Sequence, residues 1–127
     1  MAEILIAAHD EALRQLLGTA LRRFDHHVTM SVNGEHILYL LRQDIFDLVI
    51  LDESLQDTTA LSILERLNGS RSPDSKIIVL GANTSEGFIK ECLQAGACDF
   101  IVKPLSLPKL VLRVESLVGS LPAKKAG

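Results

Sequence analysis

The chain alternates short, β-rich apolar runs with segments whose apolar residues recur at helical spacing, and this alternation occurs five times. The β-rich runs are Ile4–Ala7, His27–Met30, Leu48–Leu51, Ile77–Leu80 and Phe100–Val102. Strands that alternate with helices form parallel sheets, because a parallel connection has to cross the sheet and a helix makes that crossover. The sequence therefore predicts an α/β fold, with a doubly wound, five-stranded parallel sheet and helices on both faces.

The segment after each run places its apolar residues on one face of a helix. These residues are Leu13, Leu16, Leu17, Ala20 and Leu21 in the first segment; Ile37, Leu40 and Leu41 in the second; Leu61, Leu64 and Leu67 in the third; Phe88, Ile89, Cys92 and Leu93 in the fourth; and Leu110, Val114, Leu117 and Val118 in the fifth. Asp10 and Thr58-Thr59 are placed to cap the first and third helices, and Gly96 to end the fourth.

The length of 127 residues and the hydrophobic content of 47% suit one domain with one core. We expect this domain to span residues 3–119, because the apolar period ends before Ser120. Residues 120–127 (Ser-Leu-Pro-Ala-Lys-Lys-Ala-Gly) are predicted to form a tail or linker.

The formal net charge is −3, and no run of Lys or Arg precedes the tail. A basic patch is typical of proteins that bind nucleic acid or anionic membranes, so we expect direct binding to neither. The N-terminus has no basic segment and its apolar run breaks at His9-Asp10, which matches neither a signal peptide nor a membrane span. A cytoplasmic protein is expected.

Cys92 and Cys98 form no Cys-x-x-Cys motif and have no neighbouring histidine to complete a zinc site. They are predicted to be reduced, small packing residues. His26, His27 and His36 are predicted to lie at the surface or at strand edges. No Ser-His or Cys-His pair that would indicate a nucleophile is evident.

Polar and charged residues follow the expected strands at their carboxyl ends. In a doubly wound sheet these ends share one edge, and ligands bind where the strand order reverses. The residues placed there are Ala8 to Glu11 after the first strand, Asp52 and Glu53 after the third, Gly81 to Asn83 after the fourth, and Lys103 and Pro104 after the fifth. The candidate site is therefore at this edge.

In their order and spacing, these residues and the runs around them resemble the receiver domain of bacterial two-component response regulators, over roughly residues 3–119. The motifs that support the resemblance are Ile4-Leu5-Ile6, Glu11-Ala12-Leu13-Arg14, Asp47 to Asp52 with Leu55-Gln56-Asp57, Ile77 to Leu80, Ala95-Gly96-Ala97 and Asp99 to Leu105. The resemblance implies the flavodoxin-like receiver fold, with strand order 2-1-3-4-5.

The resemblance assigns roles to four matching residues. It implies that Asp52 is the phospho-acceptor, that Lys103 contacts the phosphoryl group, and that Pro104 is the proline after this lysine, often joined by a cis bond. Phe100 matches the aromatic switch position. From the residues alone, Asp52 could also be an ordinary strand-end aspartate and Phe100 a packed aromatic.

Three positions depart from the family's pattern. The acidic pair that holds a divalent metal beside the acceptor falls on Ala8 and His9, and the switch hydroxyl falls on Gly81. Mg²⁺ requires oxygen ligands in near-octahedral geometry. We therefore expect Mg²⁺ binding to be weak or absent, and we assign no cofactor.

Four residues bear on whether any metal binding is retained. Asp52 and His9 remain as candidate ligands, since imidazole suits Zn²⁺ or Ni²⁺, although a solvated loop position is the simpler explanation of His9. Asp10 and Glu53 are nearby acids that could compensate for the missing pair. Two versions of the site are thus open, one that has lost Mg²⁺-dependent phosphorylation and one that retains it.

Three interpretations of function follow. The first is a pseudo-receiver, a signalling module in a two-component phosphorelay that acts through protein contacts and is phosphorylated at Asp52 weakly or not at all. The second is a phosphorylation-competent receiver with a compensated metal site. The third is an unrelated small-ligand enzyme on the same fold, although the loop after the first strand lacks the glycines of a phosphate-binding loop.

The expected partners are proteins: a sensor kinase, a phosphotransfer protein or an output effector. A homodimer through the fourth and fifth helices is a further alternative, because Asp99 and Arg113 lie where some receivers form intersubunit salt bridges. Lys109 stands where those receivers usually have an acid. The chain is expected to be a signalling module rather than an enzyme, with at most slow self-phosphorylation.

Overall fold

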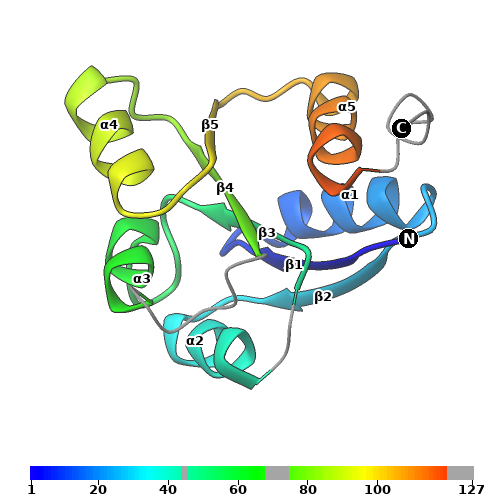
Figure 1. The fold of residues 1–127 in the computed structure, drawn as a ribbon, viewed down its shortest axis with the longest axis horizontal. Coiled ribbons are helices and arrows are strands. Elements are labelled where there is room, and N and C mark those ends of the chain that lie inside the picture. Colours follow the sequence, from blue (N-terminus) through cyan, green and yellow to red (C-terminus); the bar gives the residue numbers. More distant parts are fainter. Residues whose placement is uncertain (44–45, 68–74, 120–127) are drawn as a thin grey trace.

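Within residues 1–43, 46–67 and 75–119, which the computed structural model describes, five parallel strands form one sheet in the order β2-β1-β3-β4-β5 (Figure 1). The elements are β1 (Glu3–Ala7), α1 (Glu11–Arg22), β2 (His27–Ser31), α2 (Gly34–Gln43), β3 (Leu48–Asp52), α3 (Ala60–Arg66), β4 (Lys76–Gly81), α4 (Glu86–Gln94), β5 (Asp99–Val102) and α5 (Leu107–Val118). The predicted fold and strand order are confirmed. The tail predicted at residues 120–127 lies outside the described residues.

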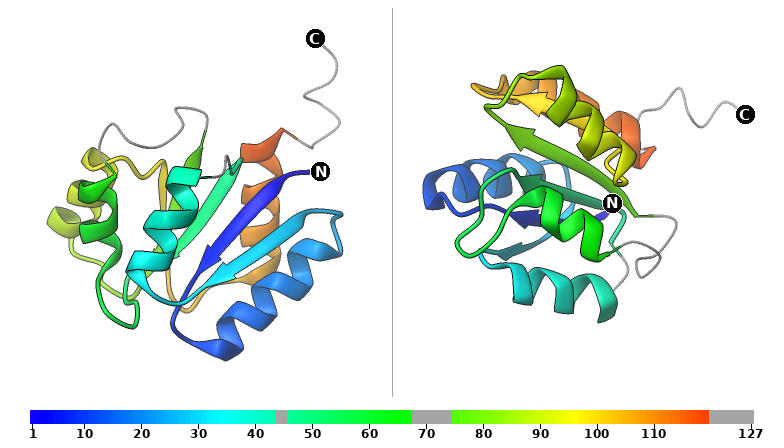
Figure 2. Two further views of the ribbon diagram at one scale, coloured as in Figure 1. Left: turned by 90° about the horizontal axis from the view of Figure 1, so that it is seen from below. Right: turned by 90° about the vertical axis from the view of Figure 1, so that its left-hand side faces the viewer.

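The sheet separates two layers of helices, as the two views in Figure 2 show. Successive side chains of a strand point to opposite faces, so β1 and β3 contribute to two cores. Ile4, Ile6 and Ile50 pack with α1 and α5, whereas Leu5 and Val49 pack with α2, α3 and α4. Full burial of an aliphatic side chain contributes about 1.5–3 kcal/mol. None of the described helices is both long and apolar enough to cross a membrane.

The central strand β3 is buried along its whole length. Its last residue is Asp52, of which 3% is exposed. Asp10 and Thr59 cap α1 and α3 as predicted, by accepting hydrogen bonds from the backbone N–H groups of Ala12 and Ser62. These caps fix where each helix begins after the carboxyl edge of the sheet.

The two cysteines lie in different environments. Cys92 is fully buried in the core under α4, as predicted, whereas Cys98 is exposed, so the packing role predicted for Cys98 is wrong. Both thiols are free. Burial, and to a lesser extent the charges of Glu53 and Glu91, raises the pKa of the Cys92 thiol. Because the thiolate is the reactive form, this residue is suited to packing rather than chemistry.

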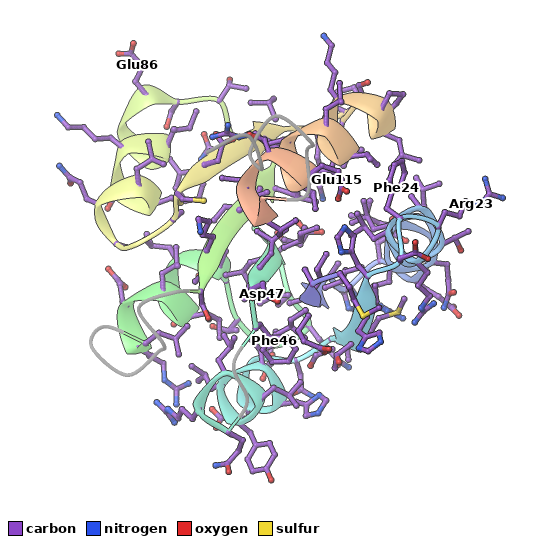
Figure 3. All side chains as sticks on the ribbon, turned by 45° about the vertical axis from the view of Figure 1, so that its right-hand side comes forward. Arg23, Phe24, Phe46, Asp47, Glu86 and Glu115 are labelled. Atoms are coloured by element: carbon purple, nitrogen blue, oxygen red, sulfur yellow. The ribbon has the colours of Figure 1, made fainter. Side chains whose placement is uncertain are left out.

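The prediction that His26 lies at the surface is also wrong. Its side chain is fully buried, and Nδ1 accepts a hydrogen bond of 3.0 Å from the Ala2 N–H. Nε2 must then carry the proton, and it donates to Glu115 Oε2 at 2.5 Å. Glu115, labelled on α5 in Figure 3, is thereby joined to the start of β1 and the turn before β2.

We expect His26→Ala to lower the free energy of unfolding by about 2–4 kcal/mol, since it removes a buried imidazole together with its hydrogen bonds to the Ala2 N–H and to the mostly buried Glu115 carboxylate. The matched control is His27→Ala. His27 pairs with Glu3 at 2.6 Å, but these side chains are 63% and 49% exposed, so a loss below about 0.5 kcal/mol is expected. Urea unfolding measures both variants, and equal losses would contradict the structural role of His26.

Candidate functional site

Asp52 and Lys103 meet at the carboxyl edge of the sheet, as their positions after β3 and β5 predict. The Lys103 N–H donates to the Gly81 carbonyl at 2.9 Å, which fixes Lys103 beside the end of β4. The peptide bond to Pro104 is cis. Lys103 Nζ donates to both carboxylate oxygens of Asp52, at 2.9 Å and 3.0 Å. One ammonium therefore binds both oxygens of the candidate acceptor.

The two positions of the expected acidic pair contain no carboxylate. Ala8 is buried directly after β1, and His9 is exposed in the loop that follows. Asp10 is also exposed, and its Oδ1 accepts the N–H of Ala12 at 3.0 Å as the cap of α1. No group of three or more His, Cys, Asp and Glu side chains suited to a metal ion occurs in the described part of the chain.

Arg14 is a site residue whose role the sequence did not indicate. Its Nη1 donates to the carbonyl oxygens of Ala8 and His9, at 2.9 Å and 2.8 Å. The guanidinium therefore fixes the loop between β1 and α1 and places positive charge beside the missing acidic pair. Arg14 belongs to one of the recognised motifs, but its acceptors are backbone atoms, which have no signature in the sequence.

Glu53 occupies the position above Gly81. Its Oε1 accepts hydrogen bonds from the N–H groups of Ala82, at 2.9 Å, and Asn83, at 3.3 Å. A Cβ atom at Gly81 would collide with this Oε1 atom and would lie 2.9 Å from Phe100 Cζ. Glu53 thus fills the space expected for the switch hydroxyl.

Phe100 is half-buried and contacts the core under α4. Its ring packs edge-on against Phe88, with ring centroids 5.9 Å apart and an interplanar angle of 89°. This geometry is favourable for two aromatic rings. In this structure Phe100 is a packed aromatic that lies against Gly81.

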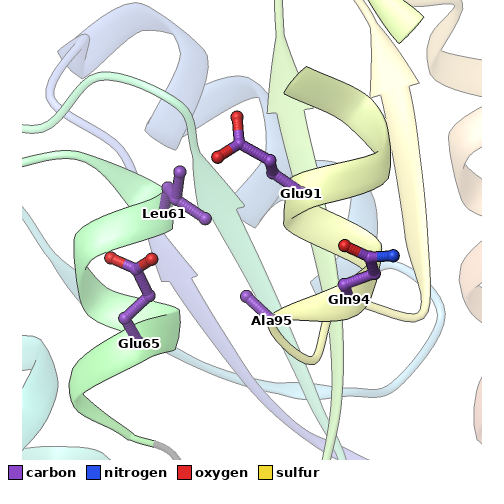
Figure 4. A pocket seen from close by; sticks show the side chains of 5 residues that line it. All are labelled: Leu61, Glu65, Glu91, Gln94 and Ala95. Carbon is purple, nitrogen blue, oxygen red and sulfur yellow. The ribbon is translucent and has the colours of Figure 1, made fainter. Parts of the chain in front are cut away.

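Hollows in the described surface include one at the carboxyl edge of the sheet and one between two helices. One, of about 450 Å³, is lined by Asp10, Leu13, Ala82, Lys103, Pro104 and Leu105, and so adjoins the ion pair. The other, of about 340 Å³, lies between α3 and α4, with Leu61 and Glu65 on one wall and Glu91, Gln94 and Ala95 on the other (Figure 4). None of the candidate site residues lines the hollow between α3 and α4, so that hollow is separate from the site.

The doubly wound sheet, with an aspartate and a lysine paired at its carboxyl edge, is the arrangement of a receiver domain. Residues 4–115 match the response regulator receiver domain family. The chain therefore belongs to this family, and it is a receiver domain of two-component signal transduction.

Individual proteins agree with this assignment. The chain is 32% identical over 119 residues to the DNA-binding transcriptional regulator NtrC of Azospirillum brasilense, which covers 94% of this chain and 24% of that protein. It is also 30% identical over 118 residues to the transcriptional regulatory protein AfsQ1 of Streptomyces coelicolor. This alignment covers 93% of this chain and 52% of that protein. The chain thus spans about a quarter to a half of these two relatives.

Solved receiver domains share the fold. The receiver domain of the Francisella response regulator 1452 superposes with a TM-score of 0.86 at 24% identity, over 94% of this chain and 98% of that one. The non-phosphorylated HemR receiver domain from Leptospira biflexa gives a TM-score of 0.84 at 26% identity, over 93% of this chain and 94% of that one.

The strength of the ion pair is measurable with a double-mutant cycle of Asp52→Asn and Lys103→Met. The Asp52 side chain is 5% exposed, so Lys103→Met leaves a buried carboxylate without its cation and should cost about 2–3 kcal/mol. The double variant should be milder, with a coupling of about 1–2 kcal/mol in urea unfolding.

The exposed pair of Arg66 and Glu35 is the control. Arg66 Nη1 lies 3.0 Å from Glu35 Oε2, and the side chains of Arg66 and Glu35 are 47% and 74% exposed. The same cycle with Arg66→Met and Glu35→Gln should give a coupling near zero. A coupling of Asp52 and Lys103 as small as this control would mean that the two groups are held apart in solution.

Proposed function

We propose that this receiver domain is a pseudo-receiver, which signals through protein contacts and is phosphorylated weakly or not at all with Mg²⁺. The observation that supports the proposal most strongly is the direct contact of Lys103 with both oxygens of Asp52, beside positions 8 and 9 that have no carboxylate. The acceptor is thus neutralised by the protein itself.

The proposal follows from the charge that phosphoryl transfer requires. A phosphoryl group that approaches a carboxylate adds negative charge to negative charge, so metal ions and ammonium groups supply most of the catalysis. Ala8 offers no side-chain oxygen and His9 offers an imidazole. Of positions 8, 9 and 52, only position 52 therefore has a carboxylate that could bind a metal ion. Mg²⁺ needs several such oxygens, so its affinity should be low.

The second candidate is a phosphorylation-competent receiver with a compensated metal site. It is favoured by the retained Asp52, Lys103 and Pro104. The two acids expected to compensate are engaged elsewhere: Asp10 caps α1, and Glu53 accepts the N–H groups of the loop after β4. These bonds use Asp10 Oδ1 and Glu53 Oε1, so compensation would have to come from the second oxygen of one carboxylate or from breaking these bonds.

The partners under this proposal are proteins: a sensor kinase, a phosphotransfer protein or an output effector. The hollow beside Lys103 is suited to such contacts, because Leu13, Pro104 and Leu105 form an apolar wall around a charged centre. The homodimer through α4 and α5 has less support. Arg113 Nε contacts Asp99 Oδ2 at 2.6 Å within the chain, so an intersubunit pair would have to replace this contact.

Mg²⁺ should leave the melting temperature of the parent domain unchanged. A ligand that binds only the folded state stabilises it by about 1.4 kcal/mol at ten times its Kd. We expect that stabilisation in the variant Ala8→Asp/His9→Asp, which rebuilds an oxygen-rich site, and not in the parent. Differential scanning fluorimetry with Mg²⁺ at millimolar concentrations measures both, and a clear shift in the parent would favour the second candidate.

Labelling with acetyl phosphate tests the chemistry directly. The repair adds Gly81→Thr for the hydroxyl, and Glu53→Ala because the new side chain would otherwise meet the Glu53 carboxylate. The variant Ala8→Asp/His9→Asp/Gly81→Thr/Glu53→Ala should become phosphorylated at Asp52 at least about tenfold faster than the parent, since one preorganised donor typically changes a rate by about 10²–10³. Its stability without metal should fall, because clustered carboxylates repel.

Mass spectrometry follows the labelling, and the same repair with Asp52→Asn is the control that should remain unlabelled. Rapid, equal labelling of parent and repaired variant would overturn the pseudo-receiver proposal. Labelling of neither would mean that these four positions do not account for the loss.

A further inference from the structure

The carboxylate of Glu53 is bound by the backbone rather than by solvent alone. It accepts N–H groups from two consecutive residues, Ala82 and Asn83, and it lies where a side chain at Gly81 would be. Hydrogen bonds to an ionised acceptor are roughly twice as strong as those between neutral groups. We propose that Glu53 is an internal anion that sets the conformation of the β4–α4 loop, residues 82–85.

The loop continues this contact into α4. Asn83 Oδ1 accepts the Ser85 N–H at 3.0 Å, and Ser85 Oγ accepts the Phe88 N–H at 3.2 Å as the cap of the helix. Each bond fixes the next residue along the chain. Glu53 therefore holds the segment that carries the cap of α4.

An aromatic contact links the first turn of α4 to Phe100, which lies beside Gly81. Phe88 packs edge-on against Phe100, and the tip of the Phe100 ring lies against the position above Gly81. Glu53 and Phe100 therefore both border the space beside Gly81, and the loop and the first turn of α4 connect them. Removal of Glu53 should loosen the loop and the contacts that continue from it.

The Glu53 carboxylate and any side chain at position 81 would compete for the same space. The carboxylate fits because residue 81 has no side chain, and any Cβ there would have to displace it. An outside anion that approached the Ala82 N–H would also have to displace it. The inference deepens the proposed function, because an internal anion holds the loop without a phosphoryl group, but it is tested without any phosphodonor.

The test uses amide exchange with solvent, measured by NMR on the whole chain. In Glu53→Ala the Ala82 and Asn83 amides should exchange about tenfold faster than in the parent, because the local opening of a hydrogen-bonded group sets its exchange rate. The Phe88 amide should accelerate as well. Glu53→Gln keeps one acceptor oxygen without its charge and should give a smaller acceleration.

The matched control is Glu86→Ala. Glu86 is an exposed acid of the first turn of α4 and extends away from the molecule in Figure 3. The substitution Glu86→Ala removes the same charge from the same region but leaves the Glu53 contacts intact. The amide exchange rates of Ala82 and Asn83 should therefore remain within about twofold of those of the parent. An equal acceleration in Glu86→Ala and Glu53→Ala would overturn the proposal, since net charge alone would then explain it.

A substitution at Gly81 should break the same hydrogen bonds without changing Glu53 itself. Gly81→Ala should displace the carboxylate by contact and accelerate the same amides, and Gly81→Ala/Glu53→Ala should add little to either single variant. Unchanged exchange in Gly81→Ala, or additive effects in the double variant, would overturn the inference. Because these readouts do not involve Asp52, failure here is distinguishable from failure of the pseudo-receiver proposal, which labelling decides.

Discussion

The ion pair between Asp52 and Lys103 is the contact on which the rest of the site depends. The fully buried strand β3 delivers Asp52 to a place where its side chain is 5% exposed, and an unpaired carboxylate there would be costly. Lys103 supplies the compensating charge from β5, across the end of β4. The pair therefore joins the end of β3 to the residue after β5, and the Lys103 N–H joins that residue to the end of β4, at the edge where ligands of this fold bind.

Parallel-sheet geometry made the fold and this pair predictable. Five apolar runs separated by helical periods predict a doubly wound parallel sheet, whose strands share one carboxyl edge where Asp52 and Lys103 both fall. The strand order, and the expectation that these two side chains act together, came from the resemblance to receiver domains. The caps at Asp10 and Thr59 were predictable for a similar reason, since a cap interacts with residues two or three positions away.

Contacts that depend on side-chain direction in loops were not predictable. Glu53 was named as an acid that could compensate at the metal site, but its carboxylate turns toward the loop after β4. Arg14 binds backbone carbonyls. His26 is hydrogen-bonded to Glu115 on α5, which is 89 residues away in the sequence. Periodicity describes one element at a time, whereas the contacts of Glu53 and His26 join residues 29 and 89 positions apart, and those of Arg14 join a helix to the backbone of the loop before it.

The departures at the site are physically connected rather than independent. Positions 8 and 9 add no negative charge beside Asp52, and Lys103 binds the Asp52 carboxylate directly. Because Gly81 has no side chain, the Glu53 carboxylate fits beside it and accepts N–H groups of the loop after β4. The ammonium and the loop donors are thus both satisfied by acids of the chain. Under the pseudo-receiver proposal, a phosphoryl group on Asp52 would have to compete with the Asp52 carboxylate for Lys103 and with Glu53 for the loop N–H groups, so these internal contacts favour the unphosphorylated state.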